Sequence, residues 1–449
     1  METKKKGFPA AFWVCACTEI FERLAYYLGR SLILIFVTAS VATGGLGLSD
    51  TVAANMQSNL TAFSYLLPLF GAVIVDKYIG ARYTTPVGMF IAAAGYFTGG
   101  IAKSSVGVYA MIFLVSLGLA LFKNGAIIGR VITDKSQMDP AFSMRYTLVN
   151  VGAFIGTFLV GILYKDVFAK DGVLGFAPCF KMAALMMVLG GLWYIFVCWR
   201  FLGDLGKLPF KKTLTEEEKA AEAKKKEETG TKQPLTTIEK KRIGAIFVAS
   251  LFSIVFWIFW YLGYMPVYFY WAENMDWVVA GYQVPSTWFD AANSLFCVIL
   301  GPLTAALWKK LAARPQGDMS LFRKTGLGIA IIGVGYLFYA AIDIMRGGEK
   351  ASVLWLIVFA FLLTMGEMFF SPLGHSFISK YSPSRYLAVM MSVWGFATFI
   401  AAKSYGPVYG LLFGGKIEFK VACIGVAVVS FVAAIIMIAL DKKLSALVD

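Results

Sequence analysis

Apolar stretches long enough to cross a bilayer as helices recur along the whole of this 449-residue chain. Charged residues make up only 15% of it, where a soluble protein has roughly 25%. A soluble fold has no use for so many apolar helices, so the sequence predicts an all-α, multi-pass membrane protein. We place twelve spans, at residues 8–37, 50–75, 83–101, 105–130, 141–164, 177–202, 243–270, 285–308, 324–345, 352–379, 386–411 and 418–440.

One charged segment, residues 203–242, interrupts the apolar pattern and separates six spans from six. We interpret it as a cytoplasmic linker, with an N-terminal bundle at 1–202 and a C-terminal bundle at 243–449. Transporters built from two related six-helix halves around a midplane cavity have this layout. The predicted fold is therefore two six-helix bundles around a central cavity.

The basic residues fall mainly in short loops on the side of the membrane that holds both chain ends. The positive-inside rule then places both termini in the cytoplasm, with the protein in an inner or plasma membrane. The same distribution argues against a nucleic-acid partner, although the net charge is +14. The first apolar segment contains two Glu and two Arg, so it is not a cleavable signal peptide.

Enzyme chemistry has no support in the sequence. There is one histidine, no Gly-rich phosphate loop and no Ser/His/Asp set, so we predict neither an enzyme nor an ATP-driven pump. The cysteines lie inside apolar segments without CxxC or Cys/His spacing, so we expect no disulfide, metal or other cofactor. They are Cys15, Cys17, Cys179, Cys198, Cys297 and Cys423.

The first span carries a charged face. At about 100° per residue, Glu22, Arg23 and Arg30 all lie within about 60° of Glu19 on a helix. Each charge at the bilayer centre costs about 2.5–3.5 kcal/mol, so this face must line a wet cavity or pair with other buried groups. A closed network that only fixes helix packing is the alternative. Because apolar replacement of such a network is often neutral or stabilising, we favour a functional role.

Several motifs are similar to those of a known family. The segment E-I-F-E-R-L-A-Y-Y at 19–27 resembles the E-x-x-E-R-F-x-Y-Y signature of the proton-dependent oligopeptide transporter family, within the major facilitator superfamily, with Leu24 in place of Phe. Further matches are Y-L-L-P-L-F-G-A-V-I-V-D at 65–76, F-S-M-R-Y-T-L-V-N-V-G at 142–152 and G-E-M-F-F-S-P-L-G at 366–374. The resemblance thus covers most of the chain.

Two further charges lie inside predicted spans, Lys123 in the fourth and Glu367 in the tenth. An ammonium in a membrane needs a carboxylate partner, and Glu367 has no cation in its own helix. We therefore expect a zwitterionic peptide to bind with its carboxylate on Arg30 and Lys123 and its ammonium on Glu367. Without substrate, Lys123 and Glu367 would pair as a cytoplasmic gate.

The resemblance implies the roles of other residues. Glu19, Glu22 and Arg23 would couple transport to protons, which serve as the coupling ion. Asp76 and Arg82, in a loop similar to a superfamily motif, would latch helix ends as part of a gate. The expected substrate-binding set is Arg23, Tyr26, Tyr27, Arg30, Tyr65, Lys123, Asn150, Asn293, Glu367 and Trp394.

The seventh span departs from the family pattern. The family has an acidic residue there, whereas this chain has Trp260 and Tyr261 and no carboxylate before Glu273. Arg30 thus lacks its expected partner, for which Asp290 is a candidate. Two other basic residues, Arg145 and Lys403, fall near span ends and are predicted to snorkel.

The leading interpretation is a proton-coupled importer of di- and tripeptides that works by alternating access. We expect a monomer whose partners are small peptides and the lipid bilayer. The closest alternative is a porter of the same fold for another anionic or peptide-like metabolite. A non-transporting receptor or scaffold is a more distant class.

Overall fold

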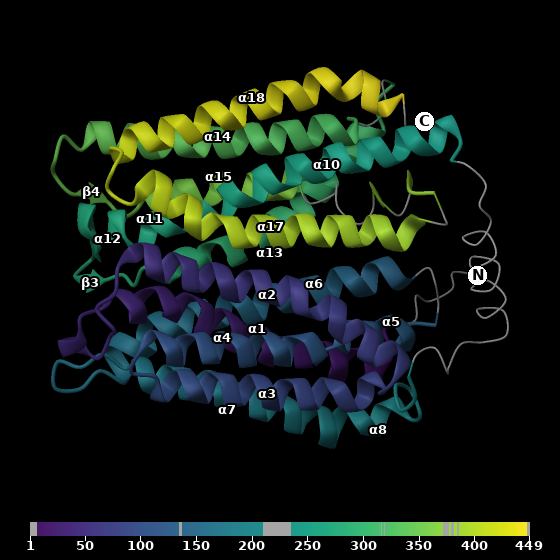
Figure 1. The fold of residues 1–449 in the computed structure, drawn as a ribbon, viewed down its shortest axis with the longest axis horizontal. Helices are drawn as coiled ribbons and strands as arrows, with labels where there is room; N and C mark the ends of the chain where they lie inside the picture. Colours follow the sequence, from purple (N-terminus) through teal and green to yellow (C-terminus); the bar gives the residue numbers. More distant parts are fainter. Residues whose placement is uncertain are drawn as a thin grey trace. The chain divides into compact units, whose positions relative to one another are not determined.

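The computed structural model describes residues 7–133, 137–209, 235–315, 317, 319–370, 377–378, 381–383 and 386–446, without the side chains of Asp76, Asp139 and Ala388. This part of the chain is almost entirely helical (Figure 1). Its contacts divide it into two compact units. The first comprises residues 1–49 and 66–214, and the second comprises residues 50–65 and 215–449.

The first unit is a bundle of long helices. Its core includes Phe12, Ile127 and Tyr194, which are all fully buried. Its elements are α1 (Ala10–Thr38), η1 (Val41–Thr43), α3 (Ala81–Ile101), α4 (Ser105–Leu121), α5 (Asn124–Val131), α6 (Met138–Ile162), the π-helical η3 (Leu163–Val167), α7 (Phe176–Trp193), the π-helical η4 (Tyr194–Cys198) and α8 (Trp199–Leu202).

The second unit adds short strands to its helices. Helices α14 and α18 lie side by side, as Figure 1 shows. Strand β1 pairs in parallel with β4, and β2 pairs with β3 antiparallel. The elements are α10 (Thr237–Leu262), α11 (Met265–Tyr268), α12 (Tyr270–Asn274), β1 (Met275–Asp276), β2 (Val278–Val279), β3 (Tyr282–Gln283), α13 (Trp288–Ala312), α14 (Leu321–Met345), β4 (Ala351–Ser352), α15 (Trp355–Phe370), α17 (Leu387–Phe413) and α18 (Phe419–Ser445).

Helix α2 (Asp50–Lys77) is divided between the two units. Its first half, Asp50–Tyr65, packs in the second unit, where Ser58 donates a 2.7 Å hydrogen bond to the carbonyl of Ala402 in α17. The hydroxyl of Tyr405 lies 3.1 Å from both the Gln57 amide oxygen and the Thr61 hydroxyl. The polar residues of this half-helix therefore find their partners on α17.

The predicted all-α architecture is confirmed. Each predicted span overlaps a helix or a run of helices in the described chain. Eight helical segments there are long and apolar enough to cross a membrane, as judged by length and composition. Helix α1 misses this criterion because it carries the charged face described above. Predicted bundle boundaries at 1–202 and 243–449 stay a prediction, and residues 210–234 of the linker lie outside the described chain.

Two predicted spans are interrupted. In the fourth, the helix ends at Leu121 and restarts at Asn124, so Lys123 stands at a break and not inside a continuous helix. The amide of Asn124 donates to the Cys15 carbonyl of α1 across 2.8 Å, a contact that the sequence pattern does not reveal. In the seventh, α10 stops at Leu262 and Pro266 follows, whose missing N–H cannot continue the ladder.

Helices α3 and α4 approach so closely that their glycines are required. A Cβ added at Gly118 would meet the Gly88 carbonyl and the backbone nitrogen of Ala92, the latter at 2.6 Å. We expect Gly118→Leu to destabilise the protein by several kcal/mol, because backbone cannot move aside as a side chain can. Thermal unfolding in detergent would measure this. Gly425→Leu, on α18 where a Cβ meets open space, is the matched control, and an equal loss in both variants would contradict the prediction.

Candidate functional site

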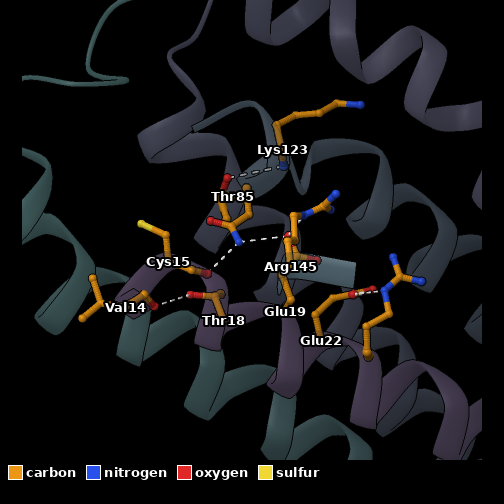
Figure 2. Close-up of polar contacts among 10 residues, drawn as sticks. Val14, Cys15, Thr18, Glu19, Glu22, Thr85, Lys123 and Arg145 are labelled. Atoms are coloured by element: carbon orange, nitrogen blue, oxygen red, sulfur yellow. Dashed lines mark hydrogen bonds and ion pairs between the residues drawn. The ribbon is translucent and has the colours of Figure 1, made fainter. Parts of the chain in front are cut away.

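The charged face of α1 is buried inside the first unit. Glu19 and Glu22 are both 0% exposed. Figure 2 shows their ion pairs. Nε of Arg23 lies 2.6 Å from Oε2 of Glu22, and Nε of Arg145 lies 2.9 Å from Oε1 of Glu19. Both arginine side chains are 29% exposed, so each pair joins a buried acid to a cation that reaches toward solvent.

Arg145 is a site residue that the sequence reasoning missed. The prediction that it snorkels near a span end was wrong, because α6 begins at Met138 and Arg145 lies two turns inside it. Its guanidinium packs where Gly125 of α5 has no side chain. Asn124 donates a second hydrogen bond to Oε1 of Glu19, at 3.0 Å. The family-like motif at 142–152 is the signal that could have drawn attention to Arg145.

Each of the two acids has a carboxylate oxygen without a hydrogen-bond donor in the described chain. Oε2 of Glu19 and Oε1 of Glu22 are buried and find no hydrogen-bond donor among the residues described here. A buried carboxylate oxygen normally has a donor, so these atoms are places where a proton or a water would bind. The α1 face therefore combines carboxylates paired with cations and carboxylate oxygens that have no donor in the described part of the chain.

Other predicted site residues of the first unit lie further along α1 and on α6. The Arg23 guanidinium stands over the ring of Tyr26, 5.4 Å from its centroid, and Tyr26 meets Tyr27 edge-on at 5.3 Å. One turn on, Arg30 is 4% exposed. Asn150 on α6 donates to the carbonyl of Tyr146 in its own helix, at 3.0 Å. Cations and aromatic rings thus continue the charged face of α1.

Lys123 has a different partner from the predicted carboxylate. Its Nζ donates to the carbonyl oxygen of Pro68 in α2, across 2.8 Å. Its backbone N–H donates to the Thr85 hydroxyl at 3.4 Å, and the side chain points away from the Glu19 cluster in Figure 2. Pairing of Lys123 with Glu367 stays a prediction, because the two residues belong to different units.

In the second unit, Glu367 on α15 is surrounded by donors. Its Oε2 lies 3.4 Å from the Asn293 amide nitrogen and 3.7 Å from Sγ of Cys297. The indole N–H of Trp260 faces this carboxylate without completing a hydrogen bond. Asn293 also donates to Thr364 at 2.8 Å, which fixes its amide. None of these contacts in the described chain is with a cation, so Glu367 can receive a positive group from a ligand.

Three more predicted residues of the second unit can be placed. Trp394 on α17 is 7% exposed. The hydroxyls of Tyr65 and Tyr261 lie 3.1 Å apart. Asp290, the candidate partner for Arg30, accepts a hydrogen bond from the Tyr268 hydroxyl within its own unit.

Lys403 also departs from expectation. It lies well inside α17, where its ammonium bonds the side-chain oxygen of Asn59 on α2. The prediction that Lys403 lies near a span end was therefore wrong.

The predicted gate residues near the second loop are only partly described. The Arg82 guanidinium donates to the carbonyls of Gly203 and Trp199, the latter at 3.1 Å, and stands 5.0 Å from the Trp199 ring centroid. It thereby holds the chain that follows α8. The side chain of Asp76 lies outside the described residues. The gating roles of Asp76 and Arg82 stay predictions.

The Glu19–Arg145 pair allows a direct test. Arg145→Gln is expected to lower the free energy of unfolding by about 3 kcal/mol, the lower end of the cost of breaking a buried pair, because Arg145 is partly exposed. Thermal denaturation in detergent would show this as a lower Tm. The double variant with Glu19→Gln removes the stranded charge and should recover most of the loss. Additive losses in the double variant would contradict the pairing.

Known proteins with similar sequences are transporters, in agreement with the family resemblance of the motifs. Residues 205–413 match the model of the POT family. An uncharacterised transporter of Bacillus subtilis is 25% identical over 89% of this chain and 87% of that protein. The di-/tripeptide transporter of Lactococcus lactis subsp. cremoris is 24% identical over 86% of each. The chain thus resembles POT family proteins, through the family model over residues 205–413 and through relatives over most of its length.

Solved structures of POT proteins show the same fold. A POT family transporter in complex with 5-aminolevulinic acid superposes with a TM-score of 0.85 at 23% identity, over 98% of each chain. A POT peptide transporter in complex with sulfate gives 0.86 at 22% identity, over 100% of this chain and 97% of that one. The major facilitator fold predicted from the sequence is thereby confirmed, and the protein is a multi-pass membrane transporter.

Proposed function

We propose that this protein is a POT family member and a proton-coupled symporter that imports di- and tripeptides by alternating access. The observation that carries the proposal is a division of charge: the first unit holds Arg23, Arg30 and Lys123, and the second holds the half-buried Glu367. A peptide has one negative and one positive end, so it can satisfy both sets. Relatives named as di-/tripeptide transporters, from Lactococcus and Yersinia, support this substrate class.

Substrate binding would use the two ends of the peptide. Its carboxylate binds Arg30 and Lys123, and Lys123 must then leave the Pro68 carbonyl. Its ammonium binds Glu367, whose present neighbours are neutral donors. The remaining predicted contacts are to the peptide backbone, which all peptides share, and so fit a broad substrate range. They come from Tyr26, Tyr27, Tyr65, Asn150, Asn293 and Trp394.

Proton coupling would use the α1 face. Glu22 shares one oxygen with Arg23 and keeps the other without a donor, so a proton can bind there and release Arg23. Glu19 is held more firmly, by Arg145 and Asn124. We therefore assign Glu22 as the residue whose protonation changes during transport and Glu19 as its fixed neighbour.

The proposal also includes the membrane topology, the gates and the oligomeric state. Both termini lie in the cytoplasm, six-helix halves at 1–202 and 243–449 rock about a central cavity, and residues 203–242 link them. Lys123 with Glu367, and Asp76 with Arg82, close the cytoplasmic side. The protein works as a monomer with protons as its only coupling ion.

Uptake of labelled dialanine into liposomes that contain the purified protein tests the proposal. An inward proton gradient is expected to produce accumulation, and a protonophore should abolish it. Protein-free liposomes are the control. Uptake that does not depend on the proton gradient would contradict proton coupling. If no dialanine enters the liposomes, the assignment of peptides as the substrate would be wrong.

A second candidate is a porter of the same fold for another peptide-like metabolite. It is favoured by Trp260 and Tyr261, which stand where the family pattern has an acid. The POT structure with 5-aminolevulinic acid shows that such a scaffold holds a small amino acid-like ligand in that protein. Competition of unlabelled 5-aminolevulinic acid against labelled dialanine would separate the two. Strong inhibition together with poor dialanine uptake favours the second candidate.

A further inference from the structure

A groove runs along the second unit between α10 and α17. It encloses about 430 Å³ and is lined almost wholly by apolar side chains. Phe247, Leu251 and Ile254 form the α10 wall, and Val393, Phe396 and Ile400 form the α17 wall. Both triplets follow the spacing of a single helix face, so the groove runs parallel to the two helices. Its one hydroxyl group, on Ser250, is already bonded to the carbonyl of Ile246 at 2.8 Å.

The α10 wall of the groove begins at Phe247, ten residues after the start of that helix. Gly244 lies one turn before Phe247, and a Cβ added to it would meet no other atom within 4 Å in the described chain. On a helix, Lys240 lies seven residues before Phe247, within about 20° of the same face and about 10 Å along the axis. Lys240 and its neighbour Lys241 are both exposed. Lys240 therefore lies on the groove face of α10, beyond the Phe247 end of the apolar wall and with Gly244 between, and Lys241 lies about 100° further around the helix.

The acid that precedes these lysines in the sequence is bonded to the start of its own helix. Glu239 completes a capping box at the start of α10: its Oε2 accepts the Thr236 backbone N–H at 2.8 Å, and its own N–H donates to the Thr236 hydroxyl at 3.2 Å. Lys240 and Lys241 are thus two exposed cations that follow an acid engaged in the cap of its own helix.

We propose that this groove binds one anionic phospholipid. Its acyl chain lies between Phe247 and Ile400, its glycerol fills the gap at Gly244, and its phosphate lies against Lys240 and Lys241. An apolar groove that continues into a basic helix end within a membrane protein is what a lipid with an anionic headgroup fits. A peptide would have to place its polar backbone against a wall without hydrogen-bonding groups, which is costly.

Native mass spectrometry of the delipidated protein in detergent tests the proposal. Phosphatidylglycerol and phosphatidylcholine with identical acyl chains are the probes. We expect one phosphatidylglycerol to bind about tenfold more tightly than phosphatidylcholine. Lys240→Gln with Lys241→Gln should abolish this preference, and Gly244→Leu should weaken binding of both lipids. The matched control, Lys309→Gln with Lys310→Gln at the end of α13, should leave the preference intact.

Several results would overturn the proposal. Equal affinity for the two lipids would show that the groove does not recognise the headgroup. If the Lys309→Gln, Lys310→Gln variant lost the preference as fully, the preference would depend on overall charge and not on this groove. Displacement of phosphatidylglycerol by inorganic phosphate would identify a free-anion site. An adduct with the mass of a second chain, in place of lipid, would identify the groove as a dimer contact.

Discussion

Glu367→Gln is expected to reduce gradient-driven uptake of dialanine about 30-fold. The carboxylate is the charged group of α15 that faces Asn293 and Cys297, and the amide cannot pair with a peptide ammonium. Loss of a buried charge pair with a ligand costs at least about 2 kcal/mol, which corresponds to about 30-fold in affinity. Initial uptake rates into liposomes at several dialanine concentrations would show the loss as a raised KM.

The substrate itself supplies the control for this prediction. N-acetyl-dialanine lacks the ammonium, so the wild-type protein should discriminate strongly against it and the Glu367→Gln variant should not. Glu273→Gln, at an exposed position of α12 in the same unit, should behave as wild type. Normal dialanine uptake by Glu367→Gln would exclude the assigned ammonium site.

Glu22→Gln is expected to abolish proton-driven accumulation of dialanine while counterflow exchange continues. The amide keeps the size of the carboxyl group and its contact with Arg23, but it cannot gain or lose a proton. The Oε1 atom that lacks a donor is thereby removed as a proton site. Accumulation driven by an inward gradient and exchange with internal unlabelled dialanine, measured on the same liposomes, separate the two activities.

The pH profile adds a second readout for Glu22. Wild-type uptake should rise as the external medium becomes more acidic, since the proton enters with the substrate. In Glu22→Gln, exchange should be nearly independent of external pH. Arg145→Gln, which removes the ion-pair partner of Glu19 and leaves the Glu22–Arg23 pair in place, should lose stability but keep a pH-dependent uptake. Continued accumulation by Glu22→Gln would assign coupling to another residue.

The spans and the charged face were predictable because they depend on local properties. Apolar length determines a span, and the 3.6-residue period places Glu19 and Glu22 on one face of α1. The partner of Glu19 was not predictable in this way. Arg145 lies more than a hundred positions away in sequence, and only the packing of α6 on α1 brings it within 2.9 Å of Glu19.

Local sequence also did not predict the break in the fourth span, which is accompanied by contacts with other helices. The apolar run of the fourth span continues past Leu121, yet the chain leaves the helix before Lys123. The contacts that accompany the break come from α1 and α2, through the carbonyls of Cys15 and Pro68. Lys403 was misplaced for a similar reason: its partner Asn59 is on a helix made early in the chain.

The division of α2 has a consequence for biosynthesis. Gln57, Ser58 and Thr61 enter the membrane among the first helices, but their partners near Ala402 and Tyr405 are synthesised more than 340 residues later. Ribosomes add about 5–20 residues per second, so these polar groups wait for many seconds before α17 arrives. During that interval the polar groups in the first half of α2 lack their α17 partners. This segment is therefore where we expect insertion chaperones to bind the nascent chain.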